Sequence, residues 1–194
     1  KEIVRGAVEA AKKYDCEIVL VGNEEQIRAE LHGEDPAALR ISIIHASEVI
    51  GMNEHPAEAV RSKKDSSVVV ATRLVKDGSC DAVFSAGSTG AAVAAAQLIL
   101  HRIRGVGRPA IATPMPTPDG VTLMLDSGAN VDSKPEHLVQ SAVMGSFYAQ
   151  YVFGIEHPRV GLLNIGEEET KGNEQVKETY PLLRDEPNIH FCGN

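Results

Sequence analysis

Short apolar runs alternate with helical patterns along this chain, and this alternation restricts the possible folds more than any other feature. Parallel strands are joined by crossover helices, so the order predicts an α/β fold with a mostly parallel sheet between two helical layers. The predicted helices are Glu2–Tyr14, Glu24–Leu31, Ser66–Lys76, Ala91–Ile103, Pro135–Phe153 and Asn173–Leu183. The predicted strands are Glu17–Val21, Leu39–His45, Asp81–Ser85, Pro109–Thr113, Val121–Asp126, Arg159–Asn164 and Asn188–Phe191, with a Pro-rich turn over Pro114–Gly120.

Polar, glycine-containing loops follow five of the predicted strands at their carboxyl ends. They are Gly22–Asn23, His45–Glu48, Ser85–Gly90, Asp126–Asp132 and Asn164–Gly172. In open α/β sheets this edge holds the ligand, so the loops predict a binding site there. The alternative is that each loop only turns the chain, because loops are polar in any protein.

The loop Ser85–Gly90 lies between a strand-like run and an alanine-rich helix, an order typical of phosphate binding. Glycine allows backbone to approach a ligand closely, and the first N–H groups of a helix attract an anion. The candidate phosphate ligands in this loop are Ser85, Gly87, Ser88, Thr89 and Gly90. The alternative is an ordinary helix N-cap after a tight turn.

Two adjacent lysines, Lys63 and Lys64, precede the predicted helix that begins at Ser66. Lysine is a mobile point charge that suits phosphate, and the capped helix start turns more donors toward the same place. We therefore assign Lys63, Lys64 and Ser66 to phosphate binding, against the alternative of a solvated charged surface.

Three polar residues at strand ends are candidates for catalysis: Asp126, Asn130 and Asn164. A carboxylate at such a position accepts a proton, orients a partner or caps its own loop. The two amides donate hydrogen bonds either to a developing oxyanion or to nearby loop backbone.

Composition argues against several functional classes. The net charge is −8, from 19 basic and 27 acidic residues, whereas nucleic-acid binders present a basic face. Aromatic residues make up only 4% of the chain, with no Trp, which disfavours a base-stacking surface. Cys16, Cys80 and Cys192 form no CxxC pair, which indicates a reducing compartment without disulfides. No apolar run approaches the length of a membrane span.

Metal and covalent catalysis lack their usual motifs. The seven histidines are scattered without metal-binding spacing, and we expect neither a metal nor a cofactor. Glu167–Glu169 offers carboxylates for Mg²⁺, but an acidic run before a helix is common because it complements the helix dipole. There is no Gly-x-Ser-x-Gly motif, and Cys16 and Cys80 precede their strands, at the opposite edge of the sheet. This pattern favours direct transfer without a covalent enzyme intermediate.

Five segments together, spread over essentially the whole chain, resemble the bacterial PlsX family of phosphate acyltransferases in phospholipid synthesis. They are Arg40–Ile50, Lys63–Ser67, Ser85–Ala91, Asp126–Glu136 and Asn164–Gly172. The resemblance implies transfer of a fatty acyl group from acyl-acyl carrier protein to inorganic phosphate, which yields acyl phosphate. It also implies a fold similar to those of phosphotransacetylase and isopropylmalate dehydrogenase. In the Asn164–Gly172 segment we assign Lys171 to catalysis, and Gly166 and Glu167 to substrate binding.

The resemblance further implies a cytoplasmic homodimer that associates peripherally with the inner face of the membrane. We expect residues 1–194 to form a single α/β/α domain, as a fragment that lacks the family's first strand and its C-terminal part. Ser88 stands where the family more often has Asn. Two other functions remain open: a phosphotransacetylase-like enzyme that uses coenzyme A, and a non-catalytic anion-binding or regulatory domain.

An acidic carrier protein requires a local basic patch on a chain whose net charge is itself −8. The densest candidate is Arg102, Arg104 and Arg108, after the predicted helix Ala91–Ile103. The alternative is that these arginines only complement the C-terminal end of the helix dipole.

Overall fold

The structure is a computed structural model that describes residues 1–118, 120–128, 130 and 132–194. Residue 119, in the predicted turn, and residues 129 and 131, in a predicted polar loop, lie outside the described residues. The chain divides into two compact units, Lys1–His101 and Arg102–Asn194, and each is described by itself. The single domain over residues 1–194 stays a prediction.

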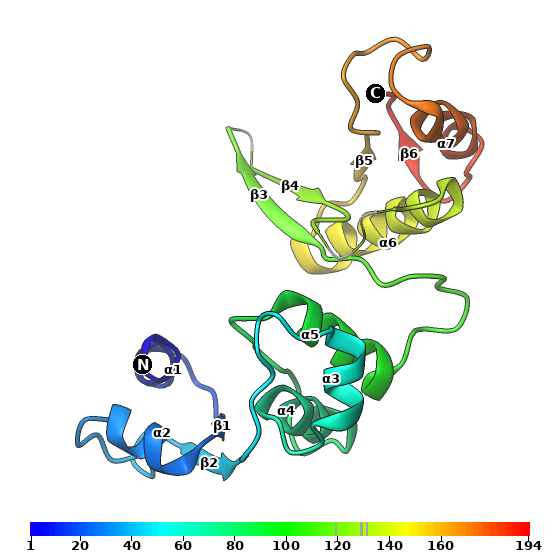
Figure 1. Ribbon diagram of the computed structural model, residues 1–194. Helices are drawn as coiled ribbons and strands as arrows, with labels where there is room; N and C mark the ends of the chain where they lie inside the picture. Colours follow the sequence, from blue (N-terminus) through cyan, green and yellow to red (C-terminus); the bar gives the residue numbers. More distant parts are fainter. Residues whose placement is uncertain (119, 129, 131) are drawn as a thin grey trace. The chain divides into compact units, whose positions relative to one another are not determined.

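The first unit begins with a helix, followed by a β–α–β arrangement and then a helical cluster (Figure 1). Its elements are α1 (Glu2–Lys13), β1 (Ile18–Gly22), α2 (Glu24–Glu30), β2 (Ile41–His45), α3 (Pro56–Ser62), α4 (Ser67–Lys76), α5 (Thr89–Ala95) and the π-helical turn η1 (Ala96–Leu100). Strands β1 and β2 are parallel, with Ile18 opposite Ile41 and Gly22 opposite His45. Their carboxyl ends therefore lie at one edge, as the sequence predicts.

Two apolar clusters hold the first unit together. One joins α1 and α2 to the strand pair; its buried members are Val4, Val8, Leu20, Ile27, Leu31 and Ile41. The four-residue spacing of Val4 and Val8 brings both onto one face of α1, which explains why this segment packs as a helix. The other cluster joins Val60 of α3, Val69 of α4 and Ala95 of α5. Through Ala95, the last residue of α5, the second cluster packs α5 against α3 and α4.

The second unit contains two further strand pairs and two helices (Figure 1). Its elements are β3 (Thr113–Thr117), β4 (Gly120–Met124), α6 (Pro135–Phe153), β5 (Arg159–Val160), α7 (Glu174–Arg184) and β6 (His190–Phe191). Strands β3 and β4 form an antiparallel hairpin, and β5 and β6 are parallel. Helix α6 has the predicted bounds: Pro135 occupies its first turn, and Gly154 ends it with a φ of 68°.

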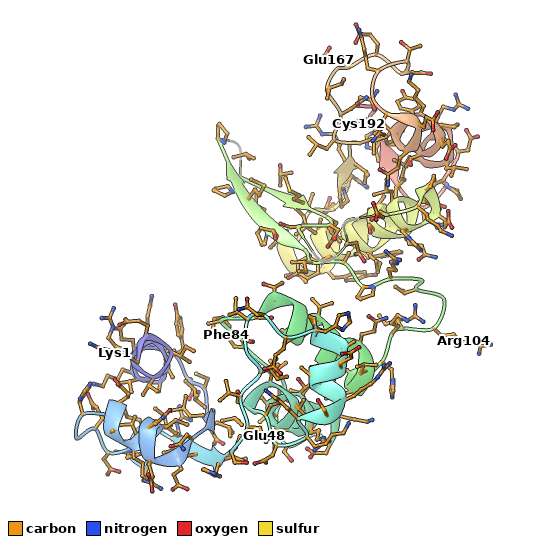
Figure 2. All side chains as sticks on the ribbon, viewed as in Figure 1. Lys1, Glu48, Phe84, Arg104, Glu167 and Cys192 are labelled. Carbon is orange, nitrogen blue, oxygen red and sulfur yellow. The ribbon has the colours of Figure 1, made fainter. Side chains whose placement is uncertain are left out.

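The strand predicted over Asp81–Ser85 does not form, and this prediction is wrong. The segment is irregular, and Phe84 is 88% exposed (Figure 2). Its backbone hydrogen-bonds to no neighbouring strand among the described residues. A strand needs such a neighbour from elsewhere in the chain, and a local apolar pattern cannot supply one.

The strand predicted over Pro109–Thr113 begins only at Thr113 and runs on to Thr117, into the expected Pro-rich turn. Pro114 and Pro116 lie at alternate positions of β3, opposite Leu123 and Val121 of β4. Prolines two residues apart lack N–H groups on the same edge of a strand, so the other edge can still pair. The prolines predict a turn here, whereas the structure forms a hairpin. Helix α3 is likewise not predicted, because its seven residues show no clear periodicity.

The α/β class is confirmed, because helices accompany the parallel pairs β1–β2 and β5–β6. The hairpin β3–β4 is the antiparallel exception. Among the described residues, no helix combines the length and hydropathy that crossing a membrane requires.

Candidate functional site

The loop before α5 contains the predicted phosphate ligands. Ser88 is the N-cap of α5, and its Oγ accepts a hydrogen bond from the Ala91 amide at 3.2 Å. Gly87 has a φ of 140°, a backbone conformation that glycine adopts without strain. The Ser85 hydroxyl lies 3.3 Å from the Gly87 carbonyl oxygen, so both serines contact their own loop. The hydrogen bonds of Ser85 and Ser88 thus agree with the alternative prediction, in which this loop is an ordinary N-cap that follows a tight turn.

Thr89 and Gly90 begin α5, and their backbone amides have no hydrogen-bond partner among the described residues. The Thr89 hydroxyl is likewise unpaired in the part of the chain that the structure describes, and both residues are exposed. A Cβ at Gly90 would lie 2.9 Å from Cγ of Pro56, so glycine allows α3 to pack closely against α5 here. Two free amides beside a free hydroxyl are hydrogen-bond donors of the kind that can bind an anion.

The two adjacent lysines before α4 have different environments. Lys63 Nζ lies 2.6 Å from Oε1 of Glu54 and 2.7 Å from the carbonyl oxygen of Val49. The hydrogen bond from Lys63, followed by one from the Gly51 amide, lowers the pKa of the Glu54 carboxyl. Lys63 therefore ties the 49–54 segment to the end of α3.

Lys64 is exposed, and within the described residues its Nζ has neither an ion-pair nor a hydrogen-bond partner. Ser66 is only 1% exposed, and its Oγ donates a hydrogen bond to the Lys63 carbonyl at 2.8 Å. Of the three residues assigned to phosphate before α4, Lys64 is the one whose functional group faces solvent unpaired in the described structure.

Hydrogen bonds among Ser47, Glu48 and Asp65, which the sequence does not predict, join the segment after β2 to the residues just before α4. The Ser47 amide and hydroxyl both donate to Oδ2 of Asp65, and the Asp65 amide donates to Oε2 of Glu48 at 2.8 Å. The Ser47 hydroxyl, followed by its amide, lowers the pKa of Asp65. These partners are 17 and 18 residues apart, so no local motif identifies them.

Asp126 and Asn130, both candidates for catalysis, contact each other directly. One carboxylate oxygen of Asp126 accepts from the Ile111 amide at 2.6 Å, and the other accepts from the Asn130 amide at 2.7 Å. The Asn130 side chain donates to the Pro109 carbonyl at 2.9 Å and to the Asp126 carboxylate at 3.1 Å. Both hydrogens of that amide are thus used within the chain, and the pair joins the 109–111 segment to the end of β4.

The remaining candidates lie on the loop between β5 and α7. Asn164 Nδ2 donates to the Lys171 carbonyl at 3.1 Å, so it joins the two ends of this loop. A Cβ at Gly166 would lie 3.1 Å from Cγ of Lys171, so the lysine stem passes over that glycine. Glu167 is exposed at the outer end of the loop (Figure 2). Lys171 is exposed, and its Nζ has no hydrogen-bond or ion-pair partner among the described residues.

Several of the predicted site residues thus contact one another within short stretches of the chain. Lys63 contacts Ser66, Asp126 contacts Asn130, and Asn164 contacts Lys171. Among the described residues, no three His, Cys, Asp or Glu side chains are grouped in a way that could hold a metal ion.

Comparison with known proteins gives consistent matches over the whole chain. Residues 1–194 match the family described as "Fatty acid synthesis protein". The phosphate acyltransferase of Desulfitobacterium hafniense (strain Y51) is 59% identical over 194 residues, which are 100% of this chain and 57% of that protein. The phosphate acyltransferase of Desulforamulus reducens is 56% identical over 193 residues, covering 100% of this chain and 57% of that protein. The chain therefore spans about 57% of the length of these curated relatives.

Among solved structures, EutD phosphotransacetylase from Staphylococcus aureus is similar with a TM-score of 0.67 and 19% sequence identity. The similarity covers 100% of this chain and 65% of that protein chain. It confirms the α/β fold class that the sequence predicts.

Proposed function

This chain belongs to the fatty acid synthesis protein family over residues 1–194, and from this membership we propose that it is part of a phosphate acyltransferase. The observation that carries the proposal is the 59% identity, over the whole chain, to the phosphate acyltransferase of Desulfitobacterium hafniense. The proposed substrates are inorganic phosphate and a fatty acyl group carried as a thioester on acyl carrier protein. The products are acyl phosphate and the free carrier thiol.

The start of α5 is the proposed phosphate site. The free amides of Thr89 and Gly90 and the Thr89 hydroxyl supply donors, and Lys64 supplies an unpaired positive charge from the same unit. Gly87 and Ser88 set the backbone path into the helix. Ser85, Lys63 and Ser66 support this path through contacts within the chain.

In the proposed reaction, a phosphate oxygen attacks the thioester carbonyl carbon. The new C–O bond forms as the C–S bond breaks, and the sulfur leaves as a thiolate that takes up the proton lost by phosphate. A thiolate leaves readily, so positioning and charge stabilisation contribute more to the rate than acid catalysis.

Four residues are proposed for the catalytic group: Asp126, Asn130, Asn164 and Lys171. The Lys171 ammonium is suited to stabilise negative charge that develops on the reacting groups. Gly166 and Glu167 lie on the same loop and are proposed to contact substrate. Asp126 and Asn130 hold each other and the 109–111 segment, which supports a role in shaping the site.

The test is an assay of the complete protein with phosphate and three acyl donors: acyl-acyl carrier protein, acyl-coenzyme A and a short acyl-pantetheine. Acyl phosphate formed only with the carrier protein would support the proposal. Efficient use of acyl-coenzyme A alone would assign the protein to a phosphotransacetylase-like activity. Phosphate binding without turnover of any donor would leave a non-catalytic anion-binding role.

We also propose that the complete protein is a cytoplasmic homodimer that associates peripherally with the inner membrane. The support is the resemblance to its family. Light scattering of the purified protein tests the dimer, and co-sedimentation with vesicles of anionic and of zwitterionic lipid tests the association. A monomer, or protein that stays in the supernatant with both lipids, would contradict the respective part.

A further inference from the structure

The loop between β5 and α7 carries four residues that the proposed function uses: Asn164, Gly166, Glu167 and Lys171. A side chain on a long exposed loop contributes to catalysis only where the loop is held in a defined conformation. The contacts that hold this loop are therefore as important as the side chains it presents.

Asn164 connects the beginning of this loop to its end. Its Oδ1 accepts a hydrogen bond from the adjacent Ile165 amide at 2.8 Å, which fixes the orientation of the side-chain amide. Its Nδ2 then donates to the carbonyl oxygen of Lys171 at 3.1 Å, seven residues along the chain. The amide therefore holds the backbone of Lys171 itself and leaves the ammonium group free.

Gly172, which follows Lys171 in the chain, packs closely against the Asn164 side chain. Its φ is 94°, and a Cβ there would lie 2.5 Å from Oδ1 of Asn164 and 2.9 Å from Cγ1 of Val176. A side chain at this position would displace the Asn164 amide. Gly172 thus allows the close approach on which the contact between Asn164 and the Lys171 backbone depends.

A second set of contacts restrains the middle of the loop. The Lys171 amide donates to the Glu168 carbonyl at 3.0 Å, and Asn194 Nδ2 donates to the same carbonyl at 3.0 Å. The stem of Lys171 passes over Gly166, where a Cβ would lie 3.1 Å from its Cγ. The direction of the lysine side chain is therefore set by contacts on its carbonyl, its amide and its stem.

We infer that Asn164 is a positioning residue that acts through Lys171: it holds the Lys171 carbonyl and thereby aims the free ammonium at the reacting groups. This inference rests on the proposed acyl transfer to phosphate. It assigns Asn164 a role different from direct donation to an oxyanion. Because the Lys171 ammonium is used in the transition state, loss of Asn164 should lower kcat more than it raises KM.

The decisive test is a double-mutant cycle in the complete protein, with Asn164→Ala, Lys171→Met and the double variant. A misplaced catalytic group costs on the order of 10- to 100-fold in rate, which is the loss of kcat expected for Asn164→Ala. In the Lys171→Met background, the same change should cost less than about twofold, because residues that act as a unit are not additive. Full multiplication of the two effects would overturn the inference.

Two further variants test the contact without shortening the side chain at position 164. Asn164→Asp keeps the acceptor for the Ile165 amide but places an oxygen against the Lys171 carbonyl. Gly172→Ala displaces the Asn164 amide from the other side. Both should lower kcat as Asn164→Ala does, and a folded Gly172→Ala variant with full activity would contradict the proposed contact.

A readout independent of activity separates this inference from the proposed function. Trypsin cleaves after exposed lysines, so a loosened loop should be cut after Lys171 faster in Asn164→Ala than in the unchanged protein. The matched control is Asn173→Ala, which removes an amide of the same type that caps α7 through the Val176 amide at 3.0 Å. This control should keep its kcat and its slow cleavage after Lys171.

The rate of cleavage reports on the loop contact, and the acyl-transfer assay reports on the proposed function. Faster cleavage in Asn164→Ala, with no acyl transfer by the unchanged protein, would refute the proposed function and leave the loop contact standing. Unchanged cleavage in a folded Asn164→Ala variant would overturn the contact itself, whatever the activity.

Discussion

Among single residues, the two lysines before α4 show how tertiary contacts separate side chains that are equivalent in sequence. Lys63 is held by Glu54 and by the Val49 carbonyl, whereas the described residues leave the Lys64 ammonium unpaired. A bound cation is partly neutralised by its partner, and a free one is available to an anion. The proposed phosphate contact therefore depends more on Lys64 than on Lys63.

Replacing Lys64 with Ala in the complete protein should raise the KM for phosphate. A hydrogen bond to a charged group is worth roughly 1.5–3 kcal/mol, so the increase should be about tenfold or more. Lys63→Ala is the comparison: it should lower the melting temperature and change the KM for phosphate less. Steady-state kinetics at varied phosphate measure both, and an unchanged KM in Lys64→Ala would assign that lysine to solvent.

Asp65 should make the stability of the first unit depend on pH. Ser47 lowers the folded-state pKa of Asp65 below its ordinary value of 3.8, so the carboxylate stabilises the fold above that pH. This contribution is lost as the pH falls through the lower folded-state pKa. Melting temperatures of the unchanged protein and of Asp65→Asn should therefore differ at pH 7 and converge in strong acid.

The control for this effect is Asp81→Asn, since Asp81 is exposed and its carboxylate makes no hydrogen bond within the described residues. Its melting temperature should follow that of the unchanged protein over the whole pH range. A difference between Asp65→Asn and the unchanged protein that persists at the lowest pH would show that the contact does not act through the carboxylate charge.

Among the helices and loops, the start of α5 is shaped by packing as well as by its cap. Gly90 lies against Pro56 of α3, and Ser88 caps the helix. The sequence predicts a helix over Ala91–Ile103, whereas the structure has α5 over Thr89–Ala95 and η1 over Ala96–Leu100. The closeness of α3 to α5 could not be predicted from local patterns, since it joins residues more than thirty positions apart.

Gly90→Ala should destabilise the first unit, because its Cβ would lie 2.9 Å from Cγ of Pro56. Overpacking of this kind costs about 1–3 kcal/mol in the free energy of unfolding. Gly6→Ala in α1 is the matched control: nothing lies within 4 Å of its Cβ, so it should stabilise by roughly 0.5–1 kcal/mol. Denaturant unfolding measures both, and equal stability of the two variants would contradict this packing.

The loop after η1 is the candidate surface for the acidic carrier protein. Arg102 donates to the Gly107 carbonyl and Arg108 to the Asp132 carbonyl, whereas Arg104 projects into solvent (Figure 2). We expect Arg104→Glu to slow association with acyl carrier protein and to flatten its salt dependence, with phosphate affinity unchanged. Stopped-flow association at several salt concentrations measures this, and unaltered kinetics would exclude the loop from docking.

For the whole molecule, the distribution of cysteines bears on the chemical route. Cys16 and Cys80 are partly buried and Cys192 is exposed, and all three are free thiols. Cys192 Sγ lies 3.2 Å from the Val160 carbonyl, which is no base for a nucleophile. Direct transfer to phosphate requires none of them.

Replacement of all three cysteines with Ser in the complete protein should therefore leave turnover largely intact. The measurement is kcat with acyl-acyl carrier protein, beside a melting curve that shows the variant is folded. Isolation of an acyl group on one of these thiols, at a rate that matches turnover, would replace direct transfer with a covalent mechanism.

The α/β class and the bounds of α1, α6 and α7, to within about one residue, follow from the sequence alone. These features rest on local physics: apolar periodicity, caps, and the need for a crossover between parallel strands. Helix α6, from Pro135 to Phe153, has the predicted bounds because proline and glycine mark both of its ends.

Which polar groups already have partners within the chain depends on the tertiary structure. Nothing near Lys63 in sequence distinguishes it from Lys64, and nothing near Asp126 shows that the distant Ile111 amide donates to its carboxylate. Whether a segment forms a strand depends on whether another strand lies beside it. The segment around the exposed Phe84 has no such neighbour among the described residues, whereas the proline-containing β3 pairs with β4. Hydrogen bonds and strand pairs join residues distant in the chain, and a local pattern carries no information about a partner that folding brings near.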